Sequence, residues 1–349
     1  MNKIYAILFV ISFGLLKAQD DTVKVNITLS PQEQAQQDYN SGLAALNAGN
    51  YSSAVEFFNK SIVNDSAFIK SYYNRSVAFS NLKNYKKAEE DINFVISMEP
   101  SNAEAYFAKG FMYYSQNNID SALSAFNHCT GIAKHPEAFY YKGLIHYQHK
   151  EYEDAVKAYT EAISAKQDYA YAYNDRASAK RALNDYKWAI TDYEKALSIN
   201  PKLTFIYNNL GSAYRLDKNY DKAIENYTKA MAAKPDYLIA LSNRGAAKLE
   251  AGKLDDAKKD FEDVLKKDPK NSGAYNNLAS VAIKQQDYKK AKEMANKAIQ
   301  LNSNNGPAYY NRGIARQMLR EEEGCCSDWK KAAELGVSSA KSFINTDCN

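Results

Sequence analysis

The sequence contains few of the features that enzymes and nucleic-acid-binding proteins need. Its 349 residues include no phosphate-binding glycine loop, no zinc-hydrolase helix motif and no nucleophile elbow. Charge of one sign is also missing, because 45 lysines and arginines are balanced by 41 aspartates and glutamates. A nearly neutral chain lacks the basic surface that nucleic acid requires. We therefore expect no enzyme activity, no cofactor and no nucleic-acid partner.

Histidine is scarce, and its distribution does not favour a metal site. The four histidines are His128, His135, His146 and His149. Only the last two have a spacing that could place them on one helix face, and a metal ion would need further ligands beside them. We interpret all four as ordinary residues of the surface and of packing seams, and we expect no bound metal.

A long hydrophobic segment occurs only near the N-terminus. A short basic start, Asn2-Lys3, precedes the apolar run from Ile4 to Leu16, and Ala18 offers a small residue for cleavage. The run is short for a membrane span, so residues 1–18 are predicted to be a secretory signal peptide. A retained anchor is the alternative. Residues 19–34 are polar and predict a tether. We expect no membrane span after cleavage.

A small residue recurs every 34 residues through most of the chain, with one interval shorter by a single residue. A period of this length indicates a solenoid of repeated units. The column consists of Ala54, Ala88, Ala122, Ala155, Ala189, Ala223, Ala257, Ala291 and Cys325. With this column as position 20, nine units span residues 35–68, 69–102, 103–135, 136–169, 170–203, 204–237, 238–271, 272–305 and 306–336, and residues 337–349 form a capping segment.

Each unit predicts two helices joined by a short turn. Positions 20, 24 and 27 form one apolar stripe at helical spacing, and positions 4, 8 and 11 form a second stripe. Position 8 is always small and position 24 is mostly aromatic, as in Gly211 and Tyr227. Small residues allow the two backbones to approach, and the ring fills the space between helices. Proline at position 32 in four units, such as Pro201, ends the second helix.

These columns together resemble the tetratricopeptide repeat, in nine copies from about Ala35 to Ser339. The resemblance implies an all-α fold, a right-handed superhelical solenoid of nine helix pairs with a short C-terminal capping helix. It also implies that helix A of each unit lines a concave face. No single unit buries its own apolar stripe, so stability accumulates at the interfaces between units.

The C-terminal region combines three of the four cysteines with a recognisable closing unit. If the protein is exported, a disulfide is expected there, and we favour Cys326–Cys348, with Cys325–Cys348 or unpaired thiols as alternatives. Cys129 occupies an apolar column, so we expect a buried, inert thiol. The stretch Gly324–Gly336 is similar to the closing unit of exported repeat proteins from the Bacteroidetes group, although Cys325 replaces the alanine usual there.

The resemblance implies that positions 5 and 6 of helix A face a groove that binds partners. Asparagine carries donors and an acceptor, so a row of asparagines could hold a peptide backbone without recognising its side chains. Rings dominate the first four units and amides the later ones. The candidate groove residues are Tyr39, Asn40, Tyr73, Asn74, Phe107, Tyr140, Asn174, Asp175, Asn208, Asn209, Asn243, Asn276, Asn277 and Asn311. Alternatively, these side chains serve only the seams between units, where polar groups need partners.

The sequence therefore predicts a non-enzymatic scaffold that binds a protein or peptide in the groove of the repeats. Self-association as a structural component of a cell-envelope complex is the alternative, and a homo-oligomer is compatible with it. The signal peptide and the closing unit predict an exported protein, periplasmic or at the cell surface of a Gram-negative bacterium. Repeat architecture does not identify the partner.

Overall fold

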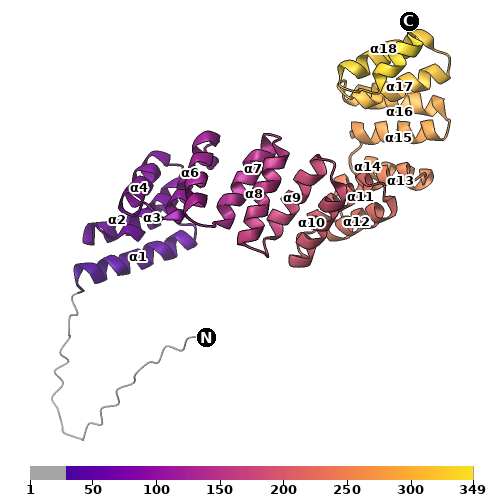
Figure 1. The fold of residues 1–349 in the computed structure, drawn as a ribbon. Helices are drawn as coiled ribbons and strands as arrows, with labels where there is room; N and C mark the ends of the chain where they lie inside the picture. The colour runs from indigo at the N-terminus through magenta and orange to yellow at the C-terminus, as the bar shows by residue number, and fades with distance from the viewer. Residues whose placement is uncertain (1–28, 349) are drawn as a thin grey trace, which may run out of the picture. The chain divides into compact units, whose positions relative to one another are not determined.

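The computed structural model describes residues 29–348, and within this range every regular element is an α-helix. Of the nineteen helices in this range, eighteen form nine consecutive antiparallel pairs, and one helix follows the ninth pair (Figure 1). The predicted all-α tetratricopeptide solenoid is therefore confirmed. The predicted signal peptide and most of the predicted tether lie outside the described residues.

The first helix of each pair is helix A and the second is helix B. The helices A are α1 Pro31–Asn47, α3 Ile69–Asn81, α5 Ala103–Ser115, α7 Pro136–Gln148, α9 Ala170–Ala182, α11 Phe205–Leu216, α13 Leu238–Glu250, α15 Ser272–Lys284 and α17 Gly306–Met318. The helices B are α2 Tyr51–Asn64, α4 Tyr85–Met98, α6 Ile119–Ile132, α8 Tyr152–Ala165, α10 Tyr186–Ile199, α12 Tyr220–Ala233, α14 Leu254–Lys267, α16 Tyr288–Leu301 and α18 Glu322–Glu334. The additional helix is α19 Ala340–Asp347.

The helices fall into two compact parts. Helices α1–α4 belong to the N-terminal part, which ends at Met98, and α5–α19 belong to the C-terminal part, which begins at Glu99. Most of the candidate site residues lie in the C-terminal part.

Close approach of helix A to helix B explains the small residues of the repeat. The eight alanines of position 20 are fully buried, and Cys325 is 3% exposed. At position 8, a Cβ atom added to Gly143 would lie 2.5 Å from the ring of Tyr159 on the facing helix. Because a buried ring cannot yield that much space, only a very small residue fits there. The paired pattern of positions 8 and 24 thus positions the two helices.

A left-handed residue at position 15 ends helix A in each unit. Lys218 has φ +62° and Gly252 has φ +77°. The next backbone N–H then donates back to a carbonyl of the last helical turn, as Asn219 does to Tyr214 at 2.8 Å. The polar break between the two predicted stripes is therefore a helix-terminating turn.

The first helix begins earlier than the sequence predicts. The sequence places residues 31–34 in the polar tether, but they form the first turn of α1. The physical reason is local. Ser30 caps the helix, since its hydroxyl accepts from the N–H of Glu33 at 3.3 Å while the Glu33 carboxylate accepts from the Ser30 N–H at 2.8 Å. Pro31 follows at the first helical position, where its missing donor has no cost.

An arginine–aspartate pair connects the two helices of four units. In α9, Arg176 donates to both carboxylate oxygens of Asp192 at 2.8 and 2.7 Å, and also to Thr160 of the preceding helix B at 3.1 Å. Position 7 thus binds position 23 of its own unit and position 25 of the preceding unit. The same bidentate pair joins Arg75–Asp91, Arg244–Asp260 and Arg312–Asp328.

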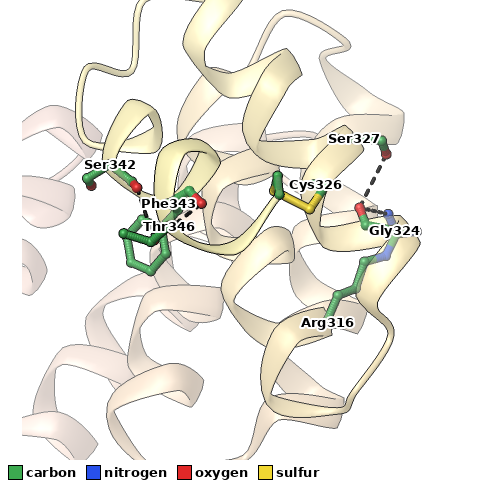
Figure 2. Close-up of a disulfide and its surroundings, with 8 residues drawn as sticks. Arg316, Gly324, Cys326, Ser327, Ser342, Phe343 and Thr346 are labelled. Atoms are coloured by element: carbon green, nitrogen blue, oxygen red, sulfur yellow. Dashed lines mark hydrogen bonds between the residues drawn. A yellow bond between two sulfur atoms is a disulfide. The ribbon is translucent and has the colours of Figure 1, made fainter.

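The last helix covers the end of the array. Trp329 of α18 is fully buried, and its ring centroid lies 4.8 Å from that of Phe343 of α19. A disulfide joins Cys326 to Cys348 with a Cα–Cα distance of 5.5 Å, the pair that the sequence favours (Figure 2). Cys325 is buried and lies outside the disulfide, and Cys129 is a fully buried thiol. Burial raises the pKa of the Cys129 thiol to about 12, which keeps it protonated.

Candidate functional site

The candidate residues occupy one face of the helices A, and many of them contact the next helix A. We call the surface formed by positions 2, 5, 6, 9, 12 and 13 of helices A the A face. Asn174, Asn208 and Asn311 are buried, with exposed fractions of 5%, 8% and 8%. Asn40 is exposed. The others are partly buried: Tyr39, Tyr73, Asn74, Phe107, Tyr140, Asp175, Asn209, Asn243, Asn276 and Asn277.

A repeated hydrogen bond joins position 6 of one unit to position 5 of the unit before it. The Nδ2 atom of Asn209 donates to Oδ1 of Asn174 at 3.3 Å, and Asn243 donates in the same way to Asn208 at 3.1 Å. Later in the chain, Asn311 donates to Oδ1 of Asn276 at 2.8 Å. Sequence reasoning considered a seam role only in general terms. The constant spacing of 35 residues is what identifies the bond.

The first two units form the same bond with a ring hydroxyl as acceptor. Asn74 donates to the hydroxyl of Tyr39 at 3.3 Å. Tyr39 also packs its ring against Phe68, with 5.2 Å between the ring centroids. Asn40 accepts from Gln36 of its own helix at 2.9 Å. In this part of the molecule the candidate side chains therefore serve helix packing at least in part.

In α5–α8 the same positions are filled by packed rings. Phe107 stacks on the imidazole of His135 at 4.4 Å and lies 5.9 Å from Phe126, measured between ring centroids. Tyr141 contacts Phe111 at 5.3 Å in an edge-to-face arrangement, which is a favoured aromatic geometry. Phe111 remains 41% exposed. This aromatic region thus has a buried ring, Phe126, at its centre and exposed rings such as Phe111 at its surface.

The aromatic and amide regions meet at Asp175, the only acid among the candidate residues. The hydroxyl of Tyr140 donates to Oδ2 of Asp175 at 2.6 Å, and the amide of Asn174 donates to Oδ1 at 2.8 Å. Asn174 in turn accepts from Asn209. Burial raises the pKa of the Asp175 carboxyl above its usual value, although both hydrogen bonds oppose this shift. A chain of hydrogen bonds across three units thus ends on one carboxylate.

Position 2 supplies exposed apolar side chains that sequence reasoning did not single out. Tyr171 of α9, Phe205 of α11 and Ile239 of α13 have exposed fractions of 47%, 40% and 61%. They recur in three successive units, each one helical turn before the position 6 residue, so they share its face. Their signal was a column of large apolar residues at a position that the core does not use.

Two of the four histidines make contacts that support the helices around them. His135 is 8% exposed and caps α7, since its Nδ1 atom accepts from the N–H of Ala138 at 3.2 Å. His146 lies 2.7 Å from the carboxylate of Glu151. Across residues 29–348, no group of three or more His, Cys, Asp or Glu side chains could hold a metal ion. In the same range no helix has the length and apolar character needed to cross a membrane.

Models of known families match two stretches of the chain, residues 81–162 and residues 170–311. Models of the tetratricopeptide repeat match residues 170–203, 202–270 and 248–311. A model described as anaphase-promoting complex, cyclosome, subunit 3 matches residues 81–162. No curated protein matches the chain.

Solved structures share the fold at low sequence identity. A tetratricopeptide repeat protein from Parabacteroides merdae is 19% identical, and the alignment covers 80% of this chain and 99% of that chain with a TM-score of 0.56. PilW, described as a widely conserved type IV pilus biogenesis factor, is also 19% identical, with 60% and 98% covered and a TM-score of 0.53. At these identities the likeness concerns the fold alone.

Proposed function

We propose that this chain, a tetratricopeptide-repeat protein by its fold and by the repeat models that match it, is a non-catalytic scaffold. It holds a protein or peptide segment along the A face of its units. The observation that carries the proposal is the orientation of the amide row by hydrogen bonds between units. A row of side chains held in one orientation loses less entropy on binding than a mobile row.

The hydrogen bonds between units and the binding of a segment are compatible. An asparagine amide has two N–H donors and an acceptor, and Asn209 uses one donor on Asn174. Its second N–H and its oxygen stay available for a peptide backbone. Asn277 has no hydrogen bond to another described side chain, so its whole amide is available. The structural role and the binding role that the sequence leaves as alternatives can thus belong to the same residues.

The two ends of the bound segment would meet different surfaces. Along α9–α13, amides contact the backbone, and the exposed side chains of Tyr171, Phe205 and Ile239 contact apolar groups. Along α5–α8, exposed rings such as Phe111 supply contact area at low cost in side-chain entropy. This arrangement favours a segment of mixed character over a uniformly charged one.

Selection of random 12-residue peptides on the purified protein tests the proposal, followed by affinity measurements on the enriched sequences. Alanine at Asn209, Asn243 and Asn277 together is expected to weaken binding. Asn277→Ala alone is the sharper variant, because it removes an amide that no seam uses. Asn127→Ala, at an exposed asparagine of α6 that lies outside the A face, is the matched control. Unchanged affinity in the triple variant, or no enriched peptide, would overturn the proposal.

We also propose that the protein is exported, to the periplasm or cell surface of a Gram-negative bacterium. The disulfide between Cys326 and Cys348 supports an oxidising compartment, where such bonds persist. The predicted signal peptide at residues 1–18 adds to this. Mass spectrometry of the protein from the producing cell would find cleavage after Ala18 and an intact disulfide. A cytosolic chain with its first residues present contradicts export.

Self-association as a component of a cell-envelope complex is the alternative function. Light scattering at increasing concentration separates the two functions, because a scaffold that binds a foreign segment remains a monomer when purified. A mass that rises with concentration, and falls when Phe205 and Ile239 are replaced by serine, would favour assembly through the A face.

A further inference from the structure

Asp175 differs from its counterparts in the other units of the amide region. Position 6 is asparagine in the following units, as in Asn209 and Asn243, where the side chain donates to the preceding helix A. Asp175 can only accept, and both of its hydrogen bonds come from donors within the chain, Tyr140 and Asn174. At Asp175 two donors therefore point toward position 6, whereas in the following units the position 6 side chain is itself the donor.

This carboxylate has no cationic partner within the described residues. No lysine, arginine or histidine of residues 29–348 forms an ion pair with Asp175, which is partly buried on the A face. Lys166, the cation of the adjacent loop, lies over the ring of Tyr169 at 5.0 Å and 3.9 Å from Glu137. A partly buried acid without a countercharge is costly, unlike the aspartates of the arginine pairs.

An exposed aromatic ring shares the helix face with this carboxylate. Tyr171 precedes Asp175 by four residues on α9, so the two side chains lie on the same face one turn apart. The ring is 47% exposed. The fully buried hydroxyl of Tyr159 has no hydrogen-bond partner among the described residues, and its ring lies 5.8 Å from that of Tyr140, whose hydroxyl binds the carboxylate. The site thus combines a charge without a cationic partner and an exposed aromatic ring.

The geometry points to a binding site for one cationic side chain, a lysine ammonium or an arginine guanidinium, formed by the Asp175 carboxylate and the Tyr171 ring. The inference rests on the proposed function in one respect, since the cation is supplied by the bound segment. Chemically, a cation satisfies both groups at once: it pairs with the carboxylate and lies over the negative face of the ring. The next unit, with Phe205 and Asn209 at the same positions, offers a ring without the charge.

Small probes test the site without knowledge of the partner. Nα-acetyl-lysine amide and Nα-acetyl-arginine amide are titrated into isotope-labelled protein, and the NMR signals of Tyr171 and Asp175 are followed. Nα-acetyl-norleucine amide is the neutral control. We expect saturable binding of at least one cationic probe, weakened about fivefold or more by Asp175→Asn, which keeps the shape of the side chain. The melting temperature of each variant shows that it folds.

Variants of the ring sharpen the result. Tyr171→Ala is expected to weaken the cationic probe about two- to fivefold, whereas Phe205→Ala, the equivalent change in the next unit, leaves it unchanged. Equal binding of norleucine amide, or equal affinity in wild type and Asp175→Asn, would overturn the inference.

The peptides selected for the proposed function provide the second readout. An enriched lysine or arginine, whose replacement by norleucine weakens wild type but not Asp175→Asn, supports the site. Enriched peptides without a required cation leave the scaffold standing and refute the site. Probe binding at Asp175 without any bound peptide supports the site and refutes the scaffold.

Discussion

The aromatic region of α5–α8 and the amide region of α9–α13 use the same repeat positions to connect neighbouring units in different ways. In the aromatic region, Phe107 and Tyr141 pack against Phe126, so the seam is closed by shape and burial. In the amide region, Asn209 and Asn243 close it with directional hydrogen bonds.

The difference shows that one backbone period tolerates two kinds of interface. Ring packing contributes mostly through buried area. Hydrogen bonds between asparagine side chains contribute about 1 kcal/mol each and fix the orientation of polar atoms at the surface. The first kind stabilises the array, and under the proposed function the second prepares a face for a ligand. The following substitutions test this distinction, beginning with the largest expected effect.

Removing a central ring should damage the aromatic region most. Phe126 is fully buried beneath Phe107 and Tyr141. Phe126→Ala is expected to lower the free energy of unfolding by about 3–5 kcal/mol, because it removes buried area and leaves a cavity. Urea denaturation followed by circular dichroism measures the effect. A loss below about 1 kcal/mol would mean that rings do not hold this region.

Breaking the arginine–aspartate pair of unit 5 should destabilise the amide region. Units 3 and 4, which form the aromatic region, have no such pair, so this contribution is specific to the amide side of the comparison. Asp192 is 4% exposed and accepts from Arg176 and Lys180. Asp192→Ala is expected to destabilise the protein by about 2–4 kcal/mol, because two cations remain beside an apolar residue. The double change Arg176→Leu with Asp192→Asn reproduces the residues of unit 6, Leu210 and Asn226. It should cost less than the single change, and a larger loss would contradict a paired role.

Single amides should show smaller effects that depend on the seam bond. Asn209→Ala leaves the buried oxygen of Asn174 without its donor and is expected to cost about 1–2 kcal/mol. Asn277→Ala is the control within the same row, and its cost should stay within about 0.5 kcal/mol. Thermal unfolding compares the two. Equal losses would show that the row acts through something other than the hydrogen bonds described.

The junction between the two regions should show a pH dependence. Burial raises the pKa of Asp175, so the folded protein holds this proton more tightly than the unfolded chain. Stability therefore falls as pH rises from about 4, near the unfolded pKa, through the folded pKa. Asp175→Asn lacks this group and should gain stability relative to wild type over that window. Parallel pH profiles would show that the carboxyl is not shifted.

Sequence columns were sufficient for the helix pairs because burial repeats with the period. Ala189 and Tyr193 are both fully buried, as their columns predict. The early start of α1 was missed because the repeat frame was given priority over a local capping pattern at Ser30 and Glu33. A repeat column gives a position the same role in every unit, so it does not reveal features that only some units have.

The candidate site was predicted only in outline. The positions of Asn209 and Asn243 on helices A follow from the period, but the partner of an amide depends on the geometry between units. The arginine–aspartate pair was recoverable in principle, since Arg244 and Asp260 recur at an offset of 16 residues in other units. The distinct environment of Asp175 depends on the hydroxyl of Tyr140 from another unit, which no pattern within one unit contains.

The capping helix has a consequence for growth of the array. Every helix B in a tandem repeat offers a surface on which a further unit can be added, and addition by another molecule would generate an open-ended filament. Phe343 and Ala340 of α19 occupy this surface on α18, where Ala340 is fully buried. The helix acts as a chain terminator in polymer terms, and the bond from Cys326 to Cys348 makes the termination covalent.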